Sequence, residues 1–408
     1  MGKQVSERKM QRNLVVFFFS FLKIFEGLGH SWFSATYSIL LFQKGLSWWR
    51  LFLPNVTYHF TLAFIDPVTG YLGDVFGHVR IYLIGLMIFA FGDLIYFFGD
   101  DLVMFNIAEF IVAIGASLMS DALESWLTNK IGYRPAHKVR SFTNYIQWLG
   151  LIPAVVGGFV AQVNVGYPFL LAAVTSLGSM LLGVFFFRRL RHALHAGVDP
   201  IKGTFRWSRT FLLAKRHLYR VYLGIHRGWK SPEFRYALTL NLVTYGAYKA
   251  FDQLWAVVLS EKLGGEVWFL GFFWIPMSLS ISFGFWRARN KTQPQKKEIS
   301  FWLVAVSLCL LAASLSDNPF LMMFFLVLHE VPRAILRETI RTYADKNIES
   351  RMRATGHSVI SSARWFGGGL SMLFAFLLGE LGIIQSPHVL WIFSAFLLTA
   401  FAVFMRRR

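Results

Sequence analysis

Long apolar runs recur along almost the whole chain, separated by short stretches that carry charged residues, glycine or proline. A helix needs roughly 20 apolar residues to cross the hydrocarbon core of a bilayer. Because only 15% of the 408 residues are charged and 55% are hydrophobic, the chain is predicted to be an all-α integral membrane protein and not a water-soluble one. The runs predict twelve transmembrane helices, at 14–42, 51–73, 81–99, 102–128, 141–161, 167–187, 236–260, 267–286, 299–316, 319–340, 355–379 and 388–405.

Lysine and arginine are concentrated in alternate connections between the predicted spans. One side of the membrane receives 33 of the 41 basic residues, whereas the other side receives only Lys44, Arg50 and Lys262. Basic segments stay in the cytoplasm, so we expect both termini to be cytoplasmic. The expected location is a bacterial-type inner (plasma) membrane. The net charge of +19 is thereby explained by orientation in a lipid bilayer, and no nucleic acid partner is expected.

One long connection, residues 188–235, divides the spans into six and six. It carries twelve Lys and Arg and only two acidic residues, which predicts a basic cytoplasmic linker that could also lie on an anionic leaflet. The four histidines of this linker are surrounded by cations, and the single cysteine, Cys309, lies in an apolar run. We therefore expect no metal site, disulfide or cofactor. The predicted organisation is a cytoplasmic tail at 1–13, a first half at 14–187, the linker at 188–235, a second half at 236–405 and a cytoplasmic end at 406–408.

Residues 66–80, which end the second span and enter the next connection, contain three glycines and opposite charges near the membrane edge. Glycine lets helices approach closely and lets the chain turn tightly. The segment resembles the loop 2–3 signature G-x-L-x-D-x-x-G-x-x-[RK] of the major facilitator superfamily. Leu72 matches this signature together with the residues that we expect to form a gating motif, Gly70, Asp74, Gly77 and Arg80, whereas Val75, His78 and Val79 depart from positions that are usually basic.

Two further segments are similar to sequences of this family. Residues 120–127 resemble the S-G-A-x-E-A-W-L run of bacterial facilitators, with Asp121 and Ser125 as departures, and Glu109 stands where the family often has an arginine. Residues 150–158 resemble the glycine-proline signature of drug antiporters, which favours export. The resemblance implies two six-helix halves related by a pseudo-two-fold axis, with a substrate site between them near the membrane midplane and transport by alternating access.

Acidic groups within the spans are the candidates for proton coupling, because an ionisable group at membrane depth is costly unless it is paired or faces water. Asp66 is the first candidate, since the adjacent proline loosens the helix. Glu124 shares a helical face with another carboxylate, which favours proton exchange, although a structural link to the loops is the alternative. Glu26 shares a face with Lys23 and His30, which could simply neutralise it. The full set is Asp66, Glu26, Glu124, Asp121, Glu109 and Asp252.

Basic groups dominate the spans of the second half. The hypothesis is that Arg333, with Arg364 or Lys249, receives a carboxylate or phosphate of the substrate through charge-assisted hydrogen bonds. The alternative is that Arg333 and Arg337 pair with their own neighbours, Glu330 and Glu338. Aromatic residues could line an amphipathic cavity or could face lipid. The full set of candidates for substrate binding is Arg333, Arg364, Lys249, Glu330, Tyr37, Trp148 and Tyr245.

These observations predict a monomeric secondary transporter that is coupled to protons and moves a small amphipathic or anionic solute, with export favoured. A nutrient or metal-chelate importer of the same fold is one alternative. A membrane-embedded enzyme or a non-transporting sensor is another, although an enzyme would be expected to place catalytic clusters in sizeable aqueous loops. The chain contains no Walker-type phosphate loop, so we expect no direct ATP drive. The one large loop is almost purely basic, so we expect no enzymatic activity.

Overall fold

The computed structural model describes residues 2–120, 122–132, 147–190, 229–288, 295–347 and 353–407, with seven further positions between 135 and 226. Within these residues the regular structure is entirely helical. Eight of the described helices are long and apolar enough to cross a membrane by length and composition. Most of the basic linker lies outside the described residues, so its place at the membrane surface stays a prediction.

Twelve helical segments coincide with the twelve predicted spans. In the first half these are α1 (Gly2–Ser31), α3 (Phe52–Phe76), α4 (His78–Phe98), α5 (Leu102–Met119), the 3-10 turn η1 (Gln147–Gly150) continued by α8 (Leu151–Val163), and α9 (Tyr167–Arg189). In the second half they are α12 (Pro232–Lys262), α13 (Trp268–Ala288), α14 (Lys296–Ser314), α15 (Pro319–Asn347), α16 (Arg353–Glu380) and α17 (Pro387–Arg407). Two short helices, α2 (Tyr37–Gln43) and α6 (Ala122–Ile131), complete the described set.

Two of the predicted spans each contain two helices, because the backbone leaves the helical conformation within the apolar run. In the span predicted at 14–42, α1 ends at Ser31, residues 32–36 form turns, and α2 follows. The span predicted at 102–128 ends as α5 at Met119. Ser120 turns out of the helix there, with ψ of 134°, and the chain continues as α6.

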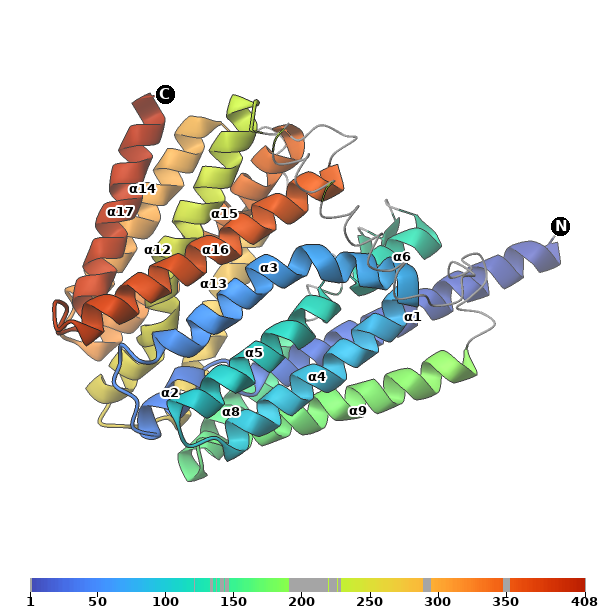
Figure 1. Ribbon diagram of the computed structural model, residues 1–408, viewed down its shortest axis with the longest axis horizontal. Coiled ribbons are helices and arrows are strands. Elements are labelled where there is room, and N and C mark those ends of the chain that lie inside the picture. Colours follow the sequence, from blue (N-terminus) through green and yellow to red (C-terminus); the bar gives the residue numbers. More distant parts are fainter. Residues whose placement is uncertain are drawn as a thin grey trace.

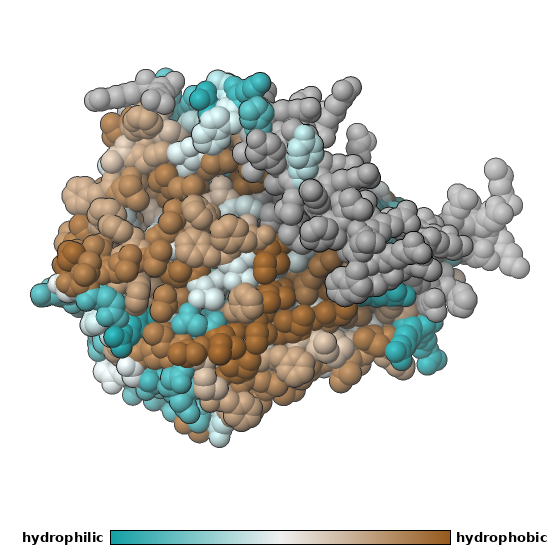
Figure 2. Space-filling view, in the orientation of Figure 1, coloured by the Kyte–Doolittle hydropathy of each residue, from teal (hydrophilic) through white to brown (hydrophobic). Residues whose placement is uncertain are grey.

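The helices form two groups that follow the order of the chain. Helices α1, α3, α4, α5 and α9 pack against one another, and so do α12 to α17. Figure 1 shows the first group in blue to green and the second in yellow to red, with α3 and α16 running side by side where the groups meet. Figure 2 shows apolar side chains over most of the body, with hydrophilic residues gathered toward its ends, as expected for a protein that spans a bilayer.

Close helix packing within the first group depends on small residues. At the α4–α5 contact, a Cβ atom on Gly85 would lie 2.8 Å from the carbonyl oxygen of Gly115, and one on Gly115 would lie 2.6 Å from the backbone nitrogen of Phe89. In lipid, where water does not drive helices together, such close backbone approach supplies much of the attraction. The α4–α5 pair is therefore a tightly packed unit.

Three consecutive glycines, Gly367–Gly369, lie in the part of α16 where the two groups meet. A Cβ atom on Gly367 would lie 3.0 Å from Cα of Leu242 on α12. One on Gly368 would lie 2.7 Å from Cδ2 of His59, and one on Gly369 would lie 3.0 Å from the ring of Phe60, both on α3. These glycines let α16 approach both α3 and α12 closely.

The two groups are held together at one end of the bundle. Nε of Arg50 donates to Oε1 of Glu380 at 2.7 Å, and the side-chain oxygen of Gln162 accepts from the backbone N–H of Val267 at 2.9 Å. Toward the opposite, basic end, where both termini lie, the two groups diverge (Figure 1). We call the joined end the acidic end, because it carries Asp100, Asp101, Glu261, Glu266 and Asp317.

Candidate functional site

Charged and aromatic side chains from three helices meet where the two groups touch. The rings of His59 on α3, Tyr245 on α12 and Trp365 on α16 contact one another, with centroids 5.4 to 5.9 Å apart. Asp66, almost two turns further along α3, accepts a hydrogen bond from Nε1 of Trp365 at 3.1 Å. We call these four residues and Arg364 the interface cluster. It brings Asp66, Tyr245 and Arg364, which the sequence nominated separately, into one place.

Arg364 lies against two aromatic rings of this cluster. Its Cζ atom is 5.1 Å from the ring centroid of Tyr245 and 4.6 Å from that of Trp365, within the range of cation–π attraction. Its Nε is buried without a hydrogen-bond partner, and none of the residues that the structure describes forms an ion pair with it. Arg364 is thus a positive charge that is held in place but not neutralised by a described carboxylate.

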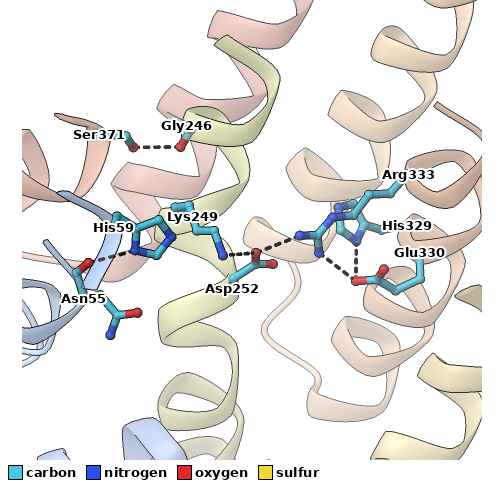
Figure 3. A network of polar contacts seen from close by, with 9 residues as sticks. All are labelled: Asn55, His59, Gly246, Lys249, Asp252, His329, Glu330, Arg333 and Ser371. Carbon is cyan, nitrogen blue, oxygen red and sulfur yellow. Dashed lines mark hydrogen bonds and ion pairs between the residues drawn. The ribbon is translucent and has the colours of Figure 1, made fainter. Parts of the chain in front are cut away.

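The other basic candidates of the second half are neutralised in a network of polar contacts (Figure 3). Arg333 donates to Oδ2 of Asp252 at 2.7 Å and to Oε1 of Glu330 at 3.0 Å. Lys249 lies 3.4 Å from the same Asp252 oxygen, and the buried His329 lies 3.5 Å from Glu330. The proposed pairing of Arg333 with Glu330 is therefore present, but Asp252 of α12 completes it.

Arg337 does not pair with Glu338 among the described contacts. Its guanidinium lies 5.8 Å from the ring centroid of Phe285 on α13, and its side chain is exposed. Among the described residues, Lys249 and Arg333 are balanced by the carboxylates of Asp252 and Glu330. Arg337 and Arg364 have no such partner in the described part of the chain, so the second half carries an excess of positive charge.

His59 presents a hydrogen-bond acceptor to the interface cluster. Its Nδ1 lies 2.7 Å from the carbonyl oxygen of Asn55. A carbonyl oxygen only accepts, so Nδ1 carries the hydrogen and, in the neutral ring, Nε2 does not. Nε2 is buried and has no partner among the described residues.

A second polar network lies inside the first half. The hydroxyl of Tyr37 donates to Oε1 of Glu109 at 2.5 Å and accepts from Nδ2 of Asn55 at 2.8 Å. Tyr96 hydrogen-bonds Tyr37 at 3.1 Å. Asp93, on the same helix as Tyr96, is 1% exposed, and neither of its carboxyl oxygens has a hydrogen-bond partner among the described residues. Glu109 and Tyr37 were nominated for different roles, and the structure brings them into direct contact.

Glu26 is neutralised within α1 and tied to α4. Lys23 lies 2.9 Å from Oε2 of Glu26, and the hydroxyl of Tyr82 donates to the same oxygen at 2.7 Å. His30 contacts only the backbone oxygen of Glu26 among these groups, at 3.0 Å. This arrangement matches the expectation that neighbours on one face offset the charge of Glu26.

The remaining candidates lie away from the interface cluster or outside the description. Trp148 is 40% exposed on η1, and Glu124 is half-buried in the first turn of α6. Gly77 has φ of +94°, which lets the chain turn between α3 and α4, and Arg80 is exposed. Asp121 and the side chain of Asp74 lie outside the description, as do the surroundings of Gly70, so the gating role of this motif stays a prediction.

Sequence reasoning missed Asp93, His59, His329 and Trp365. The first three carry a usable signal, because each is an ionisable residue within an apolar run, which is costly in a membrane. Trp365 carries no such signal among 14 tryptophans. No three His, Cys, Asp or Glu side chains of the described part converge in a way that could hold a metal ion.

The sequence matches no protein-family model and none of the curated proteins. The fold, in contrast, matches solved structures over nearly the whole chain. The nucleoside transporter NupG superposes with a TM-score of 0.70 at 13% sequence identity, covering 96% of this chain and 99% of that chain. A POT family transporter in complex with a thioalcohol-conjugated peptide gives a TM-score of 0.70 at 14% identity, covering 97% and 96%. A POT family transporter in complex with 5-aminolevulinic acid gives 0.68 at 15% identity, with the same coverage.

These matches define the class of protein. The chain is an integral, multi-pass membrane protein built of helices, and it has the fold of the major facilitator superfamily. The all-helical fold that the resemblance implied is confirmed. At these identities the likeness establishes the fold, whereas the solute must be argued from the side chains.

Proposed function

We propose that the protein is a secondary transporter that carries a small anionic solute between its two halves, together with protons. The fold supports transport, since the matched structures are described as transporters of nucleosides or peptides. Fold alone does not define a substrate. The anionic class rests on the interface cluster.

Arg364 carries this proposal. It lies at the junction of the halves, two rings fix its guanidinium, and no described residue forms an ion pair with it. A carboxylate or phosphate would find there a charged donor that is already oriented. Lys249 and Arg333, in contrast, already share Asp252 and Glu330, so we assign them to structure rather than to solute binding.

Asp66 gives a route to proton coupling. It accepts from Trp365, whose ring lies against Arg364, so an arriving anion meets a negative charge beside its own binding group. Protonation of Asp66 removes this repulsion and favours anion binding, because like charges at short range in a medium of low dielectric repel strongly. This arrangement favours movement of proton and anion in the same direction. Export, which the antiporter-like glycines favour, is the alternative.

The test is solute-dependent proton flux in proteoliposomes that contain the purified chain and an internal pH-sensitive dye. The solute panel comprises carboxylates, phosphate esters, metal chelates, sugars and lipophilic cations. Arg364→Gln should abolish flux with anions, since loss of a buried charged partner costs about 2–5 kcal/mol, and Arg364→Lys should retain part of it. Arg188→Gln, an exposed arginine at the end of α9, is the matched control and should behave as wild type.

The contrary outcomes are specific. Anion flux that is unchanged in Arg364→Gln would refute the anionic site, and flux only with sugars or lipophilic cations would refute the solute class. Asp66→Asn should leave anion exchange intact but remove its dependence on the proton gradient. Alkalinisation of the compartment from which the anion departs, measured with the gradient in each direction, indicates co-transport, whereas alkalinisation of the compartment that it enters indicates exchange for protons.

A further inference from the structure

Asp93 and Glu109 are two carboxyl groups buried in the tightly packed α4–α5 unit. Asp93 is 1% exposed and Glu109 is 5% exposed. The two groups lie close together, because a Cβ atom on Gly92, next to Asp93, would lie 3.2 Å from the carbonyl oxygen of Ala108, next to Glu109. No described residue donates a hydrogen bond to either carboxyl oxygen of Asp93. Two negative charges so close in a protein interior within a membrane repel each other and lack hydration, so one of the two groups must be neutral.

The hydrogen bonds decide which of the two carries a charge. Glu109 accepts a hydrogen bond from the hydroxyl of Tyr37 at 2.5 Å, and that hydroxyl is itself held by hydrogen bonds with Asn55 and Tyr96. This donor stabilises the ionised form of Glu109, whereas the described residues offer Asp93 no donor that would favour its ionised form. We infer that Asp93 and Glu109 form a second proton-binding site, beside Asp66, in which Asp93 holds a proton and Glu109 is the carboxylate in this conformation.

In the part of the chain that the structure describes, neither Asp93 nor Glu109 forms an ion pair with a basic side chain. The helices packed against Asp93 and Glu109 present uncharged hydroxyl groups, and the ring of His30 on α1 lies 4.5 Å from that of Phe89, one turn before Asp93. Lys23 is already paired with Glu26. The titratable groups that face the site from the described residues are Tyr37 on α2, Tyr58 on α3, Tyr96 on α4 and His30 on α1.

Hydrogen bonds connect this site with the interface cluster. Glu109 contacts Tyr37, Tyr37 accepts from the side chain of Asn55, and the backbone oxygen of Asn55 accepts from His59. Movement of His59 when the halves rearrange would therefore move Asn55 and withdraw a partner of Tyr37. Without Asn55 to orient it, the Tyr37 hydroxyl would be free to turn away from Glu109. Loss of the hydrogen bond from Tyr37 to Glu109 would leave the Glu109 anion less stabilised, which favours uptake of another proton. This coupling deepens the proposed function and rests on it.

The first test does not need the solute. Infrared spectroscopy of the purified full-length protein in detergent at neutral pH should show the carbonyl stretching band of a buried protonated carboxyl. Asp93→Asn should remove this band, whereas Glu109→Gln should keep it at a shifted frequency, because Asp93 retains its proton beside a neutral neighbour. Asp66→Asn is the matched control and should keep the Asp93 band unchanged.

Retention of the band in Asp93→Asn would overturn the assignment of the proton to Asp93. Loss of the band on addition of Na⁺ to the wild type, without a change in pH, would show a sodium site instead and would also overturn it. The second test uses proteoliposomes and whichever panel anion is transported by the wild type. Asp93→Asn should carry that anion with fewer protons per solute than wild type. If no solute moves in the wild type, the proposed function fails, but the infrared result still decides the proton site.

Discussion

Removal of the Arg333 guanidinium tests whether the polar network of the second half is structural. Arg333 makes two charge-assisted hydrogen bonds, at 2.7 and 3.0 Å, with a side chain only 21% exposed. Each such bond is worth about 1.5–3 kcal/mol, and breaking a buried pair typically costs about 3–5 kcal/mol because a charge is left uncompensated. Lys249 still lies 3.4 Å from Asp252 and offsets part of this loss. We therefore expect Arg333→Met to destabilise the protein by about 3 kcal/mol, at the lower end of that range.

The measurement is a double-mutant cycle with Arg333→Met, Asp252→Asn and the double variant. Unfolding in mixed micelles, followed by tryptophan fluorescence, gives the free energy of unfolding of each variant. The double variant should lose less than the sum of the single losses, with a coupling of about 2 kcal/mol, as expected for residues that share a network. A coupling below about 0.5 kcal/mol would show that Arg333 and Asp252 do not depend on each other, and Arg333 would return to the candidates for solute binding.

Two further predictions concern helix packing and the acidic end. Gly115→Val should destabilise the protein by about 1–3 kcal/mol in the same unfolding assay, because overpacking of a close contact has this cost. A Cβ atom on Gly115 would lie 2.6 Å from the backbone nitrogen of Phe89. Gly178→Ala is the control and should have little effect, since a Cβ atom there would have no neighbour within 4 Å. The pKa of the Glu380 carboxyl is held below its usual value of 4.5, chiefly by the hydrogen bond from Arg50. The Arg50–Glu380 pair is therefore formed at neutral pH, and it is lost when the pH falls through this lowered pKa and Glu380 is protonated. Thiol labelling slows in acid in every variant because the reactive thiolate is depleted, so the variants are compared with each other at the same pH. A cysteine introduced at the exposed Leu381 should be labelled more slowly in the wild type than in Glu380→Gln at neutral pH, and at the same rate in both in acid. Equal rates at neutral pH would contradict the role of this pair.

The sequence was sufficient for the architecture because the signal for a spanning helix is local. Each apolar run shows its own length and its charged flanks, and for this reason the twelve spans coincide with helices. The breaks after Ser31 and Met119 were missed because they arise from single backbone turns within runs that stay apolar. The six-plus-six arrangement was predicted from one long basic connection.

The site was less predictable because its contacts join residues that are distant in the chain. Glu330 lies three residues from Arg333 and was foreseen as its partner, whereas Asp252 lies on another helix. The same holds for Asp66 and Trp365. Asp93 could have been found from the sequence as a charge within an apolar run, but its lack of donors is a property of the packed helices.

The glycines at Gly367–Gly369 have a consequence for how quickly the protein changes shape. Elsewhere, packed helices can slide only when interlocked side chains change rotamer together. The three glycines have no rotamers to change, so this short part of α16 presents no side chain of its own that would oppose displacement against α3 and α12. The activation barrier to rearrangement would then be set by the few polar links that span the halves, such as Asp66–Trp365 and Arg50–Glu380. A binding event or a proton that breaks one of these links could therefore control the rate as well as the direction of the change.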